Sequence, residues 1–259
     1  MTAANQPPRP EHPEPSQKDR RMGSLLGRES LRSLVGKRCA VSWSGGKDSC
    51  LAACRAVKAG ARVEVLINMR VEGGERSRSH GLRRGVIEAQ AETMGRQLIG
   101  VGTSWKDYET NFVTVLRRLA AEGIEAVIFG DIDLQAHLEW EEMVCFQAGL
   151  IPVLPVWQGG RMELVHEFTG AGFETRIVAL KAALLSADYL GHRFTYDLAA
   201  EFERQGIDAC GENGEFHTVV TGGPLFRRPI ELVPGERVLR DGYWFLDFAV
   251  RTVKELSET

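Results

Sequence analysis

The sequence lacks paired cysteines and long apolar segments. Its five cysteines are scattered and show no CxxC spacing, which argues against a disulfide scaffold or a zinc ribbon (Cys39, Cys50, Cys54, Cys145 and Cys210). No apolar run approaches the roughly 18 residues of a membrane span. The N-terminus also lacks the apolar core that a secretory signal needs. These absences predict a cytoplasmic protein without a membrane partner.

An excess of positive charge is also missing. The 259 residues include 32 Lys and Arg against 35 Asp and Glu, a formal net charge of −3. Proteins that coat nucleic acid draw affinity from neutralising phosphates, so we expect no stable nucleic-acid partner. A small basic pocket for a nucleotide remains compatible with this charge. The length fits one large or two small domains.

Apolar residues are scarce in the first 35 positions. Half of the ten prolines of the chain fall within the first fifteen residues, among Gln, Glu, Lys and Arg. Such a segment buries too little apolar surface to offset the entropy lost on ordering. We therefore predict a disordered, proline-rich tail over residues 1–35.

Beyond the tail, short apolar runs alternate with amphipathic stretches. This alternation predicts right-handed βαβ units and a parallel sheet of five strands with helices on both faces. The expected strands are Arg38–Trp43, Arg62–Met69, Leu98–Val101, Ala126–Phe129 and Leu150–Leu154. The expected helices are Asp48–Ala59, Leu82–Gln97, Tyr108–Glu122 and Leu138–Ala148.

The regular alternation ends after Pro155. We place a first domain at residues 36–156 and a smaller α+β domain at residues 157–259. In the second domain we expect helices at Met162–Thr169 and Asp197–Gln205, with a strand at Glu174–Leu180 between them. Alternation over Ile230–Val253, with Pro-Gly and Asp-Gly turn signals at residues 234–235 and 241–242, predicts a terminal hairpin.

The most informative stretch is SGGKDS, residues 44–49, between the first expected strand and the first expected helix. Backbone N–H groups are unpaired at such a helix N-terminus, where the helix dipole is positive, so the turn is a candidate anion site. Gly45 and Gly46 allow close approach to phosphate oxygens. The hydroxyls of Ser44 and Ser49 can donate hydrogen bonds, and Lys47 adds a positive charge.

Asp48 completes this motif in the first turn of the expected helix. Its carboxylate can cap the helix or help to hold Mg²⁺. The motif is neither the Walker A loop GxxxxGK[ST] nor the Rossmann GxGxxG loop.

Two further clusters follow expected strand ends, where ligands bind in open α/β sheets. The segment from Arg76 to Arg84 contains four arginines and His80, and it can bind ATP, hold an anionic substrate or be a solvated loop. Gly130 and Asp131 follow the fourth strand, where a glycine admits the nucleotide and a carboxylate can contact metal or substrate. Beyond them, Glu139 and Glu142 are i, i+3 neighbours that can converge with His137.

The last cluster is GENGEFHT, residues 211–218. Glu212, Glu215 and His217 can together orient an amine nucleophile, accept its proton or bind Mg²⁺. A simple turn is the alternative. Cys50 and Cys210, which lie near the two motifs, are expected to be packing residues rather than nucleophiles.

The motifs resemble those of known enzymes. SGGKDS is similar to the loop of the N-type ATP pyrophosphatases (the PP-loop superfamily). Its combination with FGDI (residues 129–132), PVLPVW (residues 152–157) and GENGEFHT, in matching order, resembles the diphthine–ammonia ligase family. The resemblance covers about three-quarters of the chain. It departs from the eukaryotic pattern at Asn213, Phe216 and His217.

This resemblance implies a HUP-type nucleotide-binding domain and ATP-driven amidation of a carboxylate. The carboxylate would be adenylated with release of pyrophosphate, and ammonia or an amine would then displace AMP. ATP and Mg²⁺ are the implied cofactors, and the acceptor is a small molecule or a protein. ATP phosphates would bind Ser44–Ser49 and Gly130, whereas the implied catalytic residues are Lys47, Asp131, Glu212, Glu215 and His217.

Two alternatives stay open. A tRNA-modifying enzyme of the same superfamily would want a catalytic cysteine pair or a basic RNA-binding module, and neither is evident in the sequence. A non-catalytic ATP sensor would bind nucleotide without turnover. The acceptor, the nitrogen source and the oligomeric state, which includes a possible homodimer, are not decided by the sequence.

Overall fold

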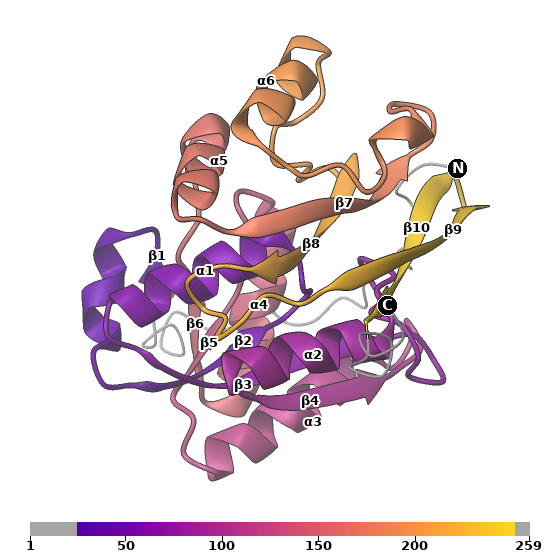
Figure 1. The fold of residues 1–259 in the computed structure, drawn as a ribbon. Coiled ribbons are helices and arrows are strands. Elements are labelled where there is room, and N and C mark those ends of the chain that lie inside the picture. The colour runs from indigo at the N-terminus through magenta and orange to yellow at the C-terminus, as the bar shows by residue number, and fades with distance from the viewer. Residues whose placement is uncertain (1–24, 252–259) are drawn as a thin grey trace.

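The computed structural model describes residues 25–251 and contains two sheets (Figure 1). The larger sheet has six parallel strands in the order β1-β6-β5-β2-β3-β4. Their bounds are β1 (Leu25–Leu26), β2 (Arg38–Ser42), β3 (Arg62–Arg70), β4 (Gln97–Gly102), β5 (Ala126–Ile128) and β6 (Ile151–Leu154). The α/β class and the five predicted strands are confirmed, and β1 adds a sixth.

Helices cover both faces of the parallel sheet because its strands are apolar on both sides. Along β2, Val41 packs toward α1 (Lys47–Lys58) and α2 (Arg84–Met94), whereas its neighbour Ala40 packs toward α3 (Tyr108–Ala121) and α4 (Gln135–Ala148). Helices α2 and α4 end at glycines with positive φ, Gly95 and Gly149. The core is therefore divided into two layers by the sheet.

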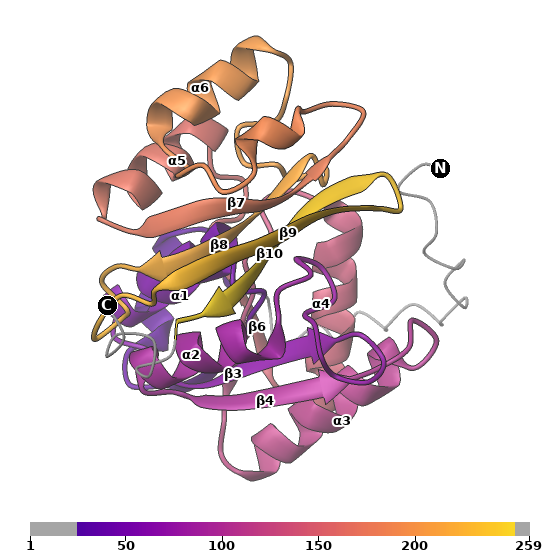
Figure 2. The ribbon, with the colours of Figure 1, turned by 45° about the vertical axis from the view of Figure 1, so that its right-hand side comes forward.

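The smaller sheet is antiparallel and has the order β8-β7-β10-β9. It consists of β7 (Glu174–Lys181), β8 (Phe216–Gly222), β9 (Leu232–Arg240) and β10 (Tyr243–Val250). This sheet lies over α1 and α2, with β8 against α1 and β10 against α2, so these helices are sandwiched between the two sheets (Figure 2). Helices α5 (Arg161–Gly170) and α6 (Tyr196–Arg204) contact each other, and α6 lies beyond the small sheet.

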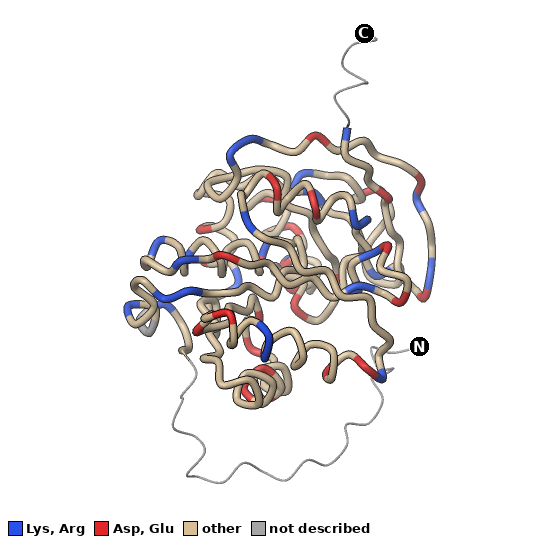
Figure 3. The backbone as a smooth tube through the Cα atoms, turned by 90° about the horizontal axis from the view of Figure 1, so that it is seen from below, with Lys and Arg blue, Asp and Glu red and all other residues tan. Residues whose placement is uncertain are grey.

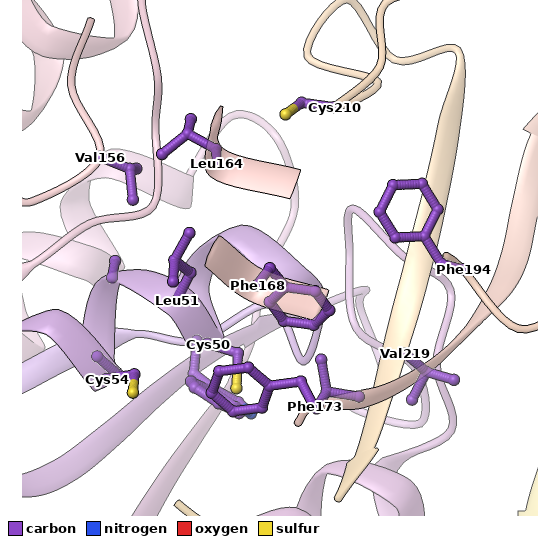
Figure 4. Close-up of a cluster of buried hydrophobic side chains, with 14 of the residues drawn as sticks. Cys50, Leu51, Cys54, Val156, Leu164, Phe168, Phe173, Phe194, Cys210 and Val219 are labelled. Atoms are coloured by element: carbon purple, nitrogen blue, oxygen red, sulfur yellow. The ribbon is translucent and has the colours of Figure 1, made fainter. Parts of the chain in front are cut away.

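An apolar cluster joins the two parts of the chain (Figure 4). Leu51 of α1, Phe168 of α5 and Val219 of β8 are all buried in it. The N-terminal end of α1 is therefore held against the smaller sheet by shared packing. The domain boundary near residue 157 stays a prediction.

The predicted tail is wrong over its last eleven residues, 25–35. Leu25 and Leu26 pair with Val153 and Leu154 at the edge of the parallel sheet, and the 3₁₀ helix η1 (Glu29–Leu34) follows. Leu34 is fully buried. The apolar residues of this segment gain neighbours only when β6 and α1 are in place, and the local composition does not reveal either contact. The rest of the tail, residues 1–24, lies outside the described residues.

The terminal hairpin is present, but only one of its two turn signals forms a turn. Asp241 and Gly242 have φ values of 51° and 79°, which is the geometry of a two-residue type I′ turn between β9 and β10. Pro234 lies inside β9 and pairs with Phe248 beside a register shift. A proline is tolerated there because β9 is an edge strand.

Charges of both signs are interspersed along the described chain (Figure 3). This distribution matches the nearly balanced composition. Among residues 25–251, no helix combines the length and apolar character needed to cross a membrane.

Candidate active site

The SGGKDS motif forms the turn between β2 and α1. Gly46 is the N-cap of α1, and its N–H donates to the hydroxyl of Ser44 at 3.2 Å. The hydroxyls of Ser44 and Ser49 are 3.0 Å apart. The turn therefore presents hydroxyls and the positive end of a helix at the carboxyl edge of the parallel sheet, which is the arrangement of an anion site.

Glycine is required at three positions of this site for different reasons. Gly45 has a φ of +86°, a region that side chains disfavour. Gly46 has an ordinary φ, but an added Cβ would lie 2.4 Å from Nε2 of His80. A Cβ on Gly130 would lie 2.6 Å from the backbone nitrogen of Ser49. The glycine after β5 thus lets α1 approach the sheet closely.

The turn is tied to β8, a strand that the sequence analysis did not predict. The backbone N–H of Lys47 donates to the hydroxyl of Thr218 at 3.1 Å, and the N–H of Val220 donates to the carbonyl of Gly45 at 3.0 Å. Because β8 contains the end of GENGEFHT, these bonds bring the two motifs together across more than 170 residues of sequence.

Gln90 of α2 is a second residue that sequence reasoning missed. Its fully buried amide donates to the carbonyls of Gly45 and Val220 and accepts from the indole of Trp43. Every one of these bonds stabilises the turn from behind. The signal in the sequence was a polar residue on the apolar face of a helix, flanked by Ile87 and Ala91.

Lys47 lies between the two parts of the chain. Its side chain is 6% exposed, and its ammonium donates to Asp48 at 2.8 Å and to the carbonyl of Cys210. It also lies 5.8 Å and 5.4 Å from the ring centroids of Phe194 and Phe216. Burial alone would lower the pKa of Lys47, but the charge of Asp48, its hydrogen bond and the charge of Glu212 contribute to a larger opposing effect, and the pKa is raised. Lys47 is therefore a permanent buried cation.

Glu212 and Asp131 form the carboxylate half of the site. An oxygen of Glu212 accepts a 2.9 Å hydrogen bond from the backbone N–H of Ile132, next to Asp131. Burial raises the pKa of Glu212 to about 7, and the charges of Asp48 and Asp131 add to the rise. Burial also raises the pKa of Asp48. Glu212 is thus poised to exchange a proton near neutral pH.

Asp131 is hydrogen-bonded to two residues of α4. Its Oδ1 lies 2.6 Å from Nδ1 of His137. Burial alone would raise the pKa of Asp131, but hydrogen bonds with His137 and Glu141 outweigh it and the pKa is lowered. Glu139 and Glu142 of the same helix are both exposed, and their convergence with His137 stays a prediction.

The buried acid of α4 is Glu141, which is only 3% exposed. Burial raises its pKa well above the usual range, and the neighbouring Asp131 adds to the effect. Since Asp131 is ionised and Glu141 protonated, the pair shares one proton. The sequence shows all three glutamates of this helix. Which of them is buried at the site depends on how the helix is rotated against the sheet, and in the structure it is Glu141.

His80 and His217 form the imidazole half of the site. Their ring centroids are 4.6 Å apart, and Nδ1 of His80 lies 2.9 Å from the hydroxyl of Ser79. Burial lowers the pKa of His217 to about 4, and the charge of Lys47 contributes. Burial likewise lowers the pKa of His80 well below its usual range, with contributions from His217 and Lys47. Both rings are neutral at physiological pH.

Glu215 lies apart from the other carboxylates. It is 8% exposed, and its Oε2 has no hydrogen-bond partner. Its Oε1 lies 3.4 Å from the amide nitrogen of Asn213. The structure therefore brings Glu212 to Asp131 and His217 to His80, whereas Glu215 occupies its own buried position near Tyr243.

Three of the four arginines between residues 76 and 84 form ion pairs, whereas Arg78 forms none with the described residues. Arg76 and Arg83 both pair with Asp247 of β10, which anchors the terminal hairpin. Arg84 pairs with Glu88 one turn along α2. Arg78 instead lies 4.4 Å from the ring centroid of Trp105, and its Nε is buried without a partner.

All five cysteines are buried and free. Burial raises the pKa of Cys50, Cys145 and Cys210, so these thiols are poor nucleophiles. Within residues 25–251, no group of three or more His, Cys, Asp or Glu side chains is placed to hold a metal ion. We therefore assign no metal ligand among the residues of the GENGEFHT motif.

The chain matches two described protein domains. Residues 37–152 match the diphthamide synthase N-terminal domain, and residues 161–258 match the diphthamide synthase C-terminal domain. It is also similar to curated proteins named diphthine–ammonia ligase. The protein from Rattus norvegicus is 28% identical over 238 residues, which cover 82% of this chain and 89% of the relative.

Two other relatives carry the same name. The protein from Homo sapiens is 27% identical over 246 residues, 85% of this chain and 91% of the relative. The protein from Schizosaccharomyces pombe is 26% identical over 220 residues, 75% of this chain but 36% of the relative. The two domain matches together span most of the chain, in the order that the motifs predicted, and the protein therefore belongs to the diphthamide synthase family.

Proposed function

We propose that the protein is an AMP-forming ligase, which uses ATP to activate a carboxylate and then transfers ammonia or an amine to it. The observation that carries this proposal is the bond between the two motifs, from the Lys47 N–H to Thr218. It joins the SGGKDS turn, which can bind an anion, to the motif that contains Glu212 and His217. The ligase names of the relatives support the same class of reaction.

The first step needs a site for the departing pyrophosphate. The acceptor carboxylate attacks the α-phosphorus, and the bond to the β-phosphate oxygen breaks. The start of α1 and the hydroxyls of Ser44 and Ser49 would stabilise the charge that develops on the leaving group.

Magnesium fits the site as an ion that arrives with ATP. Mg²⁺ is usually held by one or two carboxylates together with substrate phosphates and water. Asp48, in the first turn of α1, would supply such a carboxylate. When bound, the ion would neutralise phosphate charge.

The second step needs a base. When ammonia attacks the acyl carbon, AMP leaves and the nitrogen must lose a proton. Glu212 has a pKa of about 7 and lies beside Asp131, so it can accept that proton near neutral pH. We assign Glu212 as the base, with Asp131 ordering the backbone edge beside it. Glu215 would orient the incoming amine.

The acceptor follows from the names of the relatives. Diphthine, amidated by ammonia, is the first acceptor to test, because the curated relatives are named diphthine–ammonia ligases. Another carboxylate acceptor would use the same activated intermediate. The homodimer stays a prediction.

The test is to incubate the protein with ATP, ammonium and a diphthine-bearing protein and to separate the products. AMP and pyrophosphate, formed in step with the amide, are expected. Formation of ADP and orthophosphate without AMP would reject the proposal. ATP binding with no turnover on any carboxylate would favour a sensor. Binding of tRNA that falls steeply with salt would favour an RNA-modifying enzyme.

A further inference from the structure

The imidazole pair lies directly on the predicted phosphate turn. Nε2 of His80 occupies the space that a Cβ on Gly46 would take, 2.4 Å away, and Gly46 is the N-cap of α1. His217 comes from β8 and lies 4.6 Å from His80, centroid to centroid. Two imidazoles from separate elements therefore border the positive end of one helix.

The ring nitrogens of this pair are largely unused. Nδ1 of His80 is paired with Ser79 at 2.9 Å. In the described part of the chain, Nε2 of His80 and both ring nitrogens of His217 have no hydrogen-bond partner. None of these three nitrogens is among the buried, unpaired side-chain atoms of the described residues, so each is open to a bound molecule. A ring nitrogen that carries a proton can donate to an anion at the helix N-terminus.

Charges around the pair explain why it is neutral without a ligand. The start of α1 contributes its dipole and the ammonium of Lys47, which lowers the pKa of both rings. Strand β10 contributes the ring of Tyr243, whose centroid is 6.4 Å from that of His217, and Glu215 precedes β8. No carboxylate among the described residues forms an ion pair with either histidine.

We propose that His80 is an additional ligand for the phosphates of the nucleotide and that it acts with His217 as a clamp that takes up a proton when they bind. This inference rests on the proposed function, because it takes the turn at Gly46 as the phosphate site. A diphosphate group brings several negative charges to rings that are held neutral mainly by burial and one cation. Protonation then makes both nitrogens of a ring donors, and such hydrogen bonds to phosphate are charge-assisted.

The clamp also explains why a glycine at position 46 lies against His80, a pairing that phosphate binding by the turn does not require by itself. Gly46 has no backbone need for glycine, since its φ of −93° suits any residue. It is the contact with Nε2 of His80 that excludes a side chain there. The tight fit keeps the imidazole within reach of whatever binds the turn.

The test is calorimetric titration of the full-length protein with inorganic pyrophosphate at pH 6, in two buffers of different ionisation enthalpy. The difference in heat gives the number of protons taken up. We compare the wild type with His80→Gln, His217→Gln and the double variant, and use the exposed His192→Gln as the matched control. Protonation of pyrophosphate itself is the same in every arm and cancels.

The wild type should take up about half a proton or more in excess of the double variant, and each single variant should bind roughly tenfold more weakly. His192→Gln should match the wild type. Equal proton uptake in wild type and double variant, or unchanged affinity in His80→Gln, would overturn the clamp while leaving the proposed function intact. A wild type that binds no pyrophosphate would reject both.

A second measurement needs no variant. In NMR spectra of the wild type, titrated with and without pyrophosphate, the midpoint of the His217 ring signals should rise by about two pH units on binding, because its pKa is about 4 and half a proton is expected at pH 6. The midpoint of His80 should rise as well. Midpoints that stay in place would contradict the clamp even if all variants failed to fold.

Discussion

The carboxylate half and the imidazole half of the site respond to burial in opposite directions. Burial raises the pKa of Glu212 to about 7, whereas it lowers the pKa of His217 to about 4. The physical cause is the same, because a poorly solvated environment disfavours whichever form carries charge. Near neutral pH, Glu212 is partly protonated and His217 is unprotonated.

The charge of Lys47 affects the pKa values of both halves of the site. This charge lowers the pKa of His217 and also opposes the rise in the pKa of Glu212. Near neutral pH the site therefore contains one permanent cation, a partly charged carboxylate and two neutral imidazoles. Substitutions in the carboxylate half and in the imidazole half should therefore change the pH dependence of stability in opposite directions.

The largest expected effect is on catalysis, from the carboxylate that lies outside both halves. Glu215→Gln should reduce amide formation by about a hundredfold or more, because the amine loses its orienting carboxylate. Binding of ATP should be preserved, since Glu215 does not contact the SGGKDS turn. Calorimetry with ATP and product analysis measure the two effects separately. A loss of ATP affinity in this variant would show that Glu215 acts in ATP binding rather than in orienting the amine.

Replacing the shared cation should disturb both halves together. Lys47→Met leaves Asp48 and the Cys210 carbonyl unpaired in a buried environment, so we expect a loss of about 3 kcal/mol in the free energy of unfolding. The pKa of His217 should rise, because the neighbouring positive charge is gone. Chemical denaturation and NMR titration check these results. A stable variant with an unchanged His217 would mean that burial alone sets the imidazole half.

The opposite pKa shifts predict opposite pH dependences of stability. The folded-state pKa of Glu212 is raised, so its contribution is present below pH 4.5 and is lost as pH rises through about 7. The folded-state pKa of His217 is lowered, so its contribution is present above pH 6.5 and is lost as pH falls through about 4.

Glu212→Gln should therefore be more stable than wild type at pH 8.5, by about 1–2 kcal/mol after partial exposure is considered. His217→Gln should show its gain only near pH 4.5. Thermal unfolding of both variants across pH 4.5 to 8.5 measures the difference. Parallel curves for the two variants would remove the contrast between the halves.

The smallest expected effect is at Asp247, which pairs with Arg76 and Arg83 away from both halves of the site. Hydrogen bonds with Arg83 and Arg76 overcome the effect of burial and lower the pKa of Asp247 to about 2. The stability that this carboxylate contributes is present above pH 3.8 and is lost as pH falls through about 2. Asp247→Asn should reduce stability at pH 7 by about 1 kcal/mol without changing ATP affinity. A weaker affinity would show that the terminal hairpin shapes the nucleotide site.

Much of the parallel sheet and its glycine-rich turn could be predicted because their signals are local. A β-branched run followed by two glycines and a helix start places SGGKDS at a strand end without reference to any distant residue. The last turn signal, Asp241-Gly242, is local in the same way and forms the predicted hairpin turn. Strand β8 (Phe216–Gly222) could not be predicted in the same way. Its first three residues belong to the GENGEFHT motif, whose residue types indicate a catalytic site rather than a strand.

The contacts that organise the site could not be predicted, because each joins segments far apart in sequence. Arg83 pairs with Asp247 across 164 residues, and the Lys47 N–H meets Thr218 across 171. Choosing Glu141 over Glu139 and Glu142 depends on how α4 rotates against the sheet, which the apolar positions of that helix leave open. The edge strand β1 likewise exists only because β6 offers unpaired backbone groups.

The sequence by itself determined that a glycine-rich turn opens the first helix of a parallel α/β sheet, because backbone freedom and strand propensity are properties of neighbouring residues. Only the tertiary structure decided which groups surround that turn and which of them carry a proton. Protonation depends on burial and on nearby charge, and both arise only when the small antiparallel sheet packs over α1 and α2.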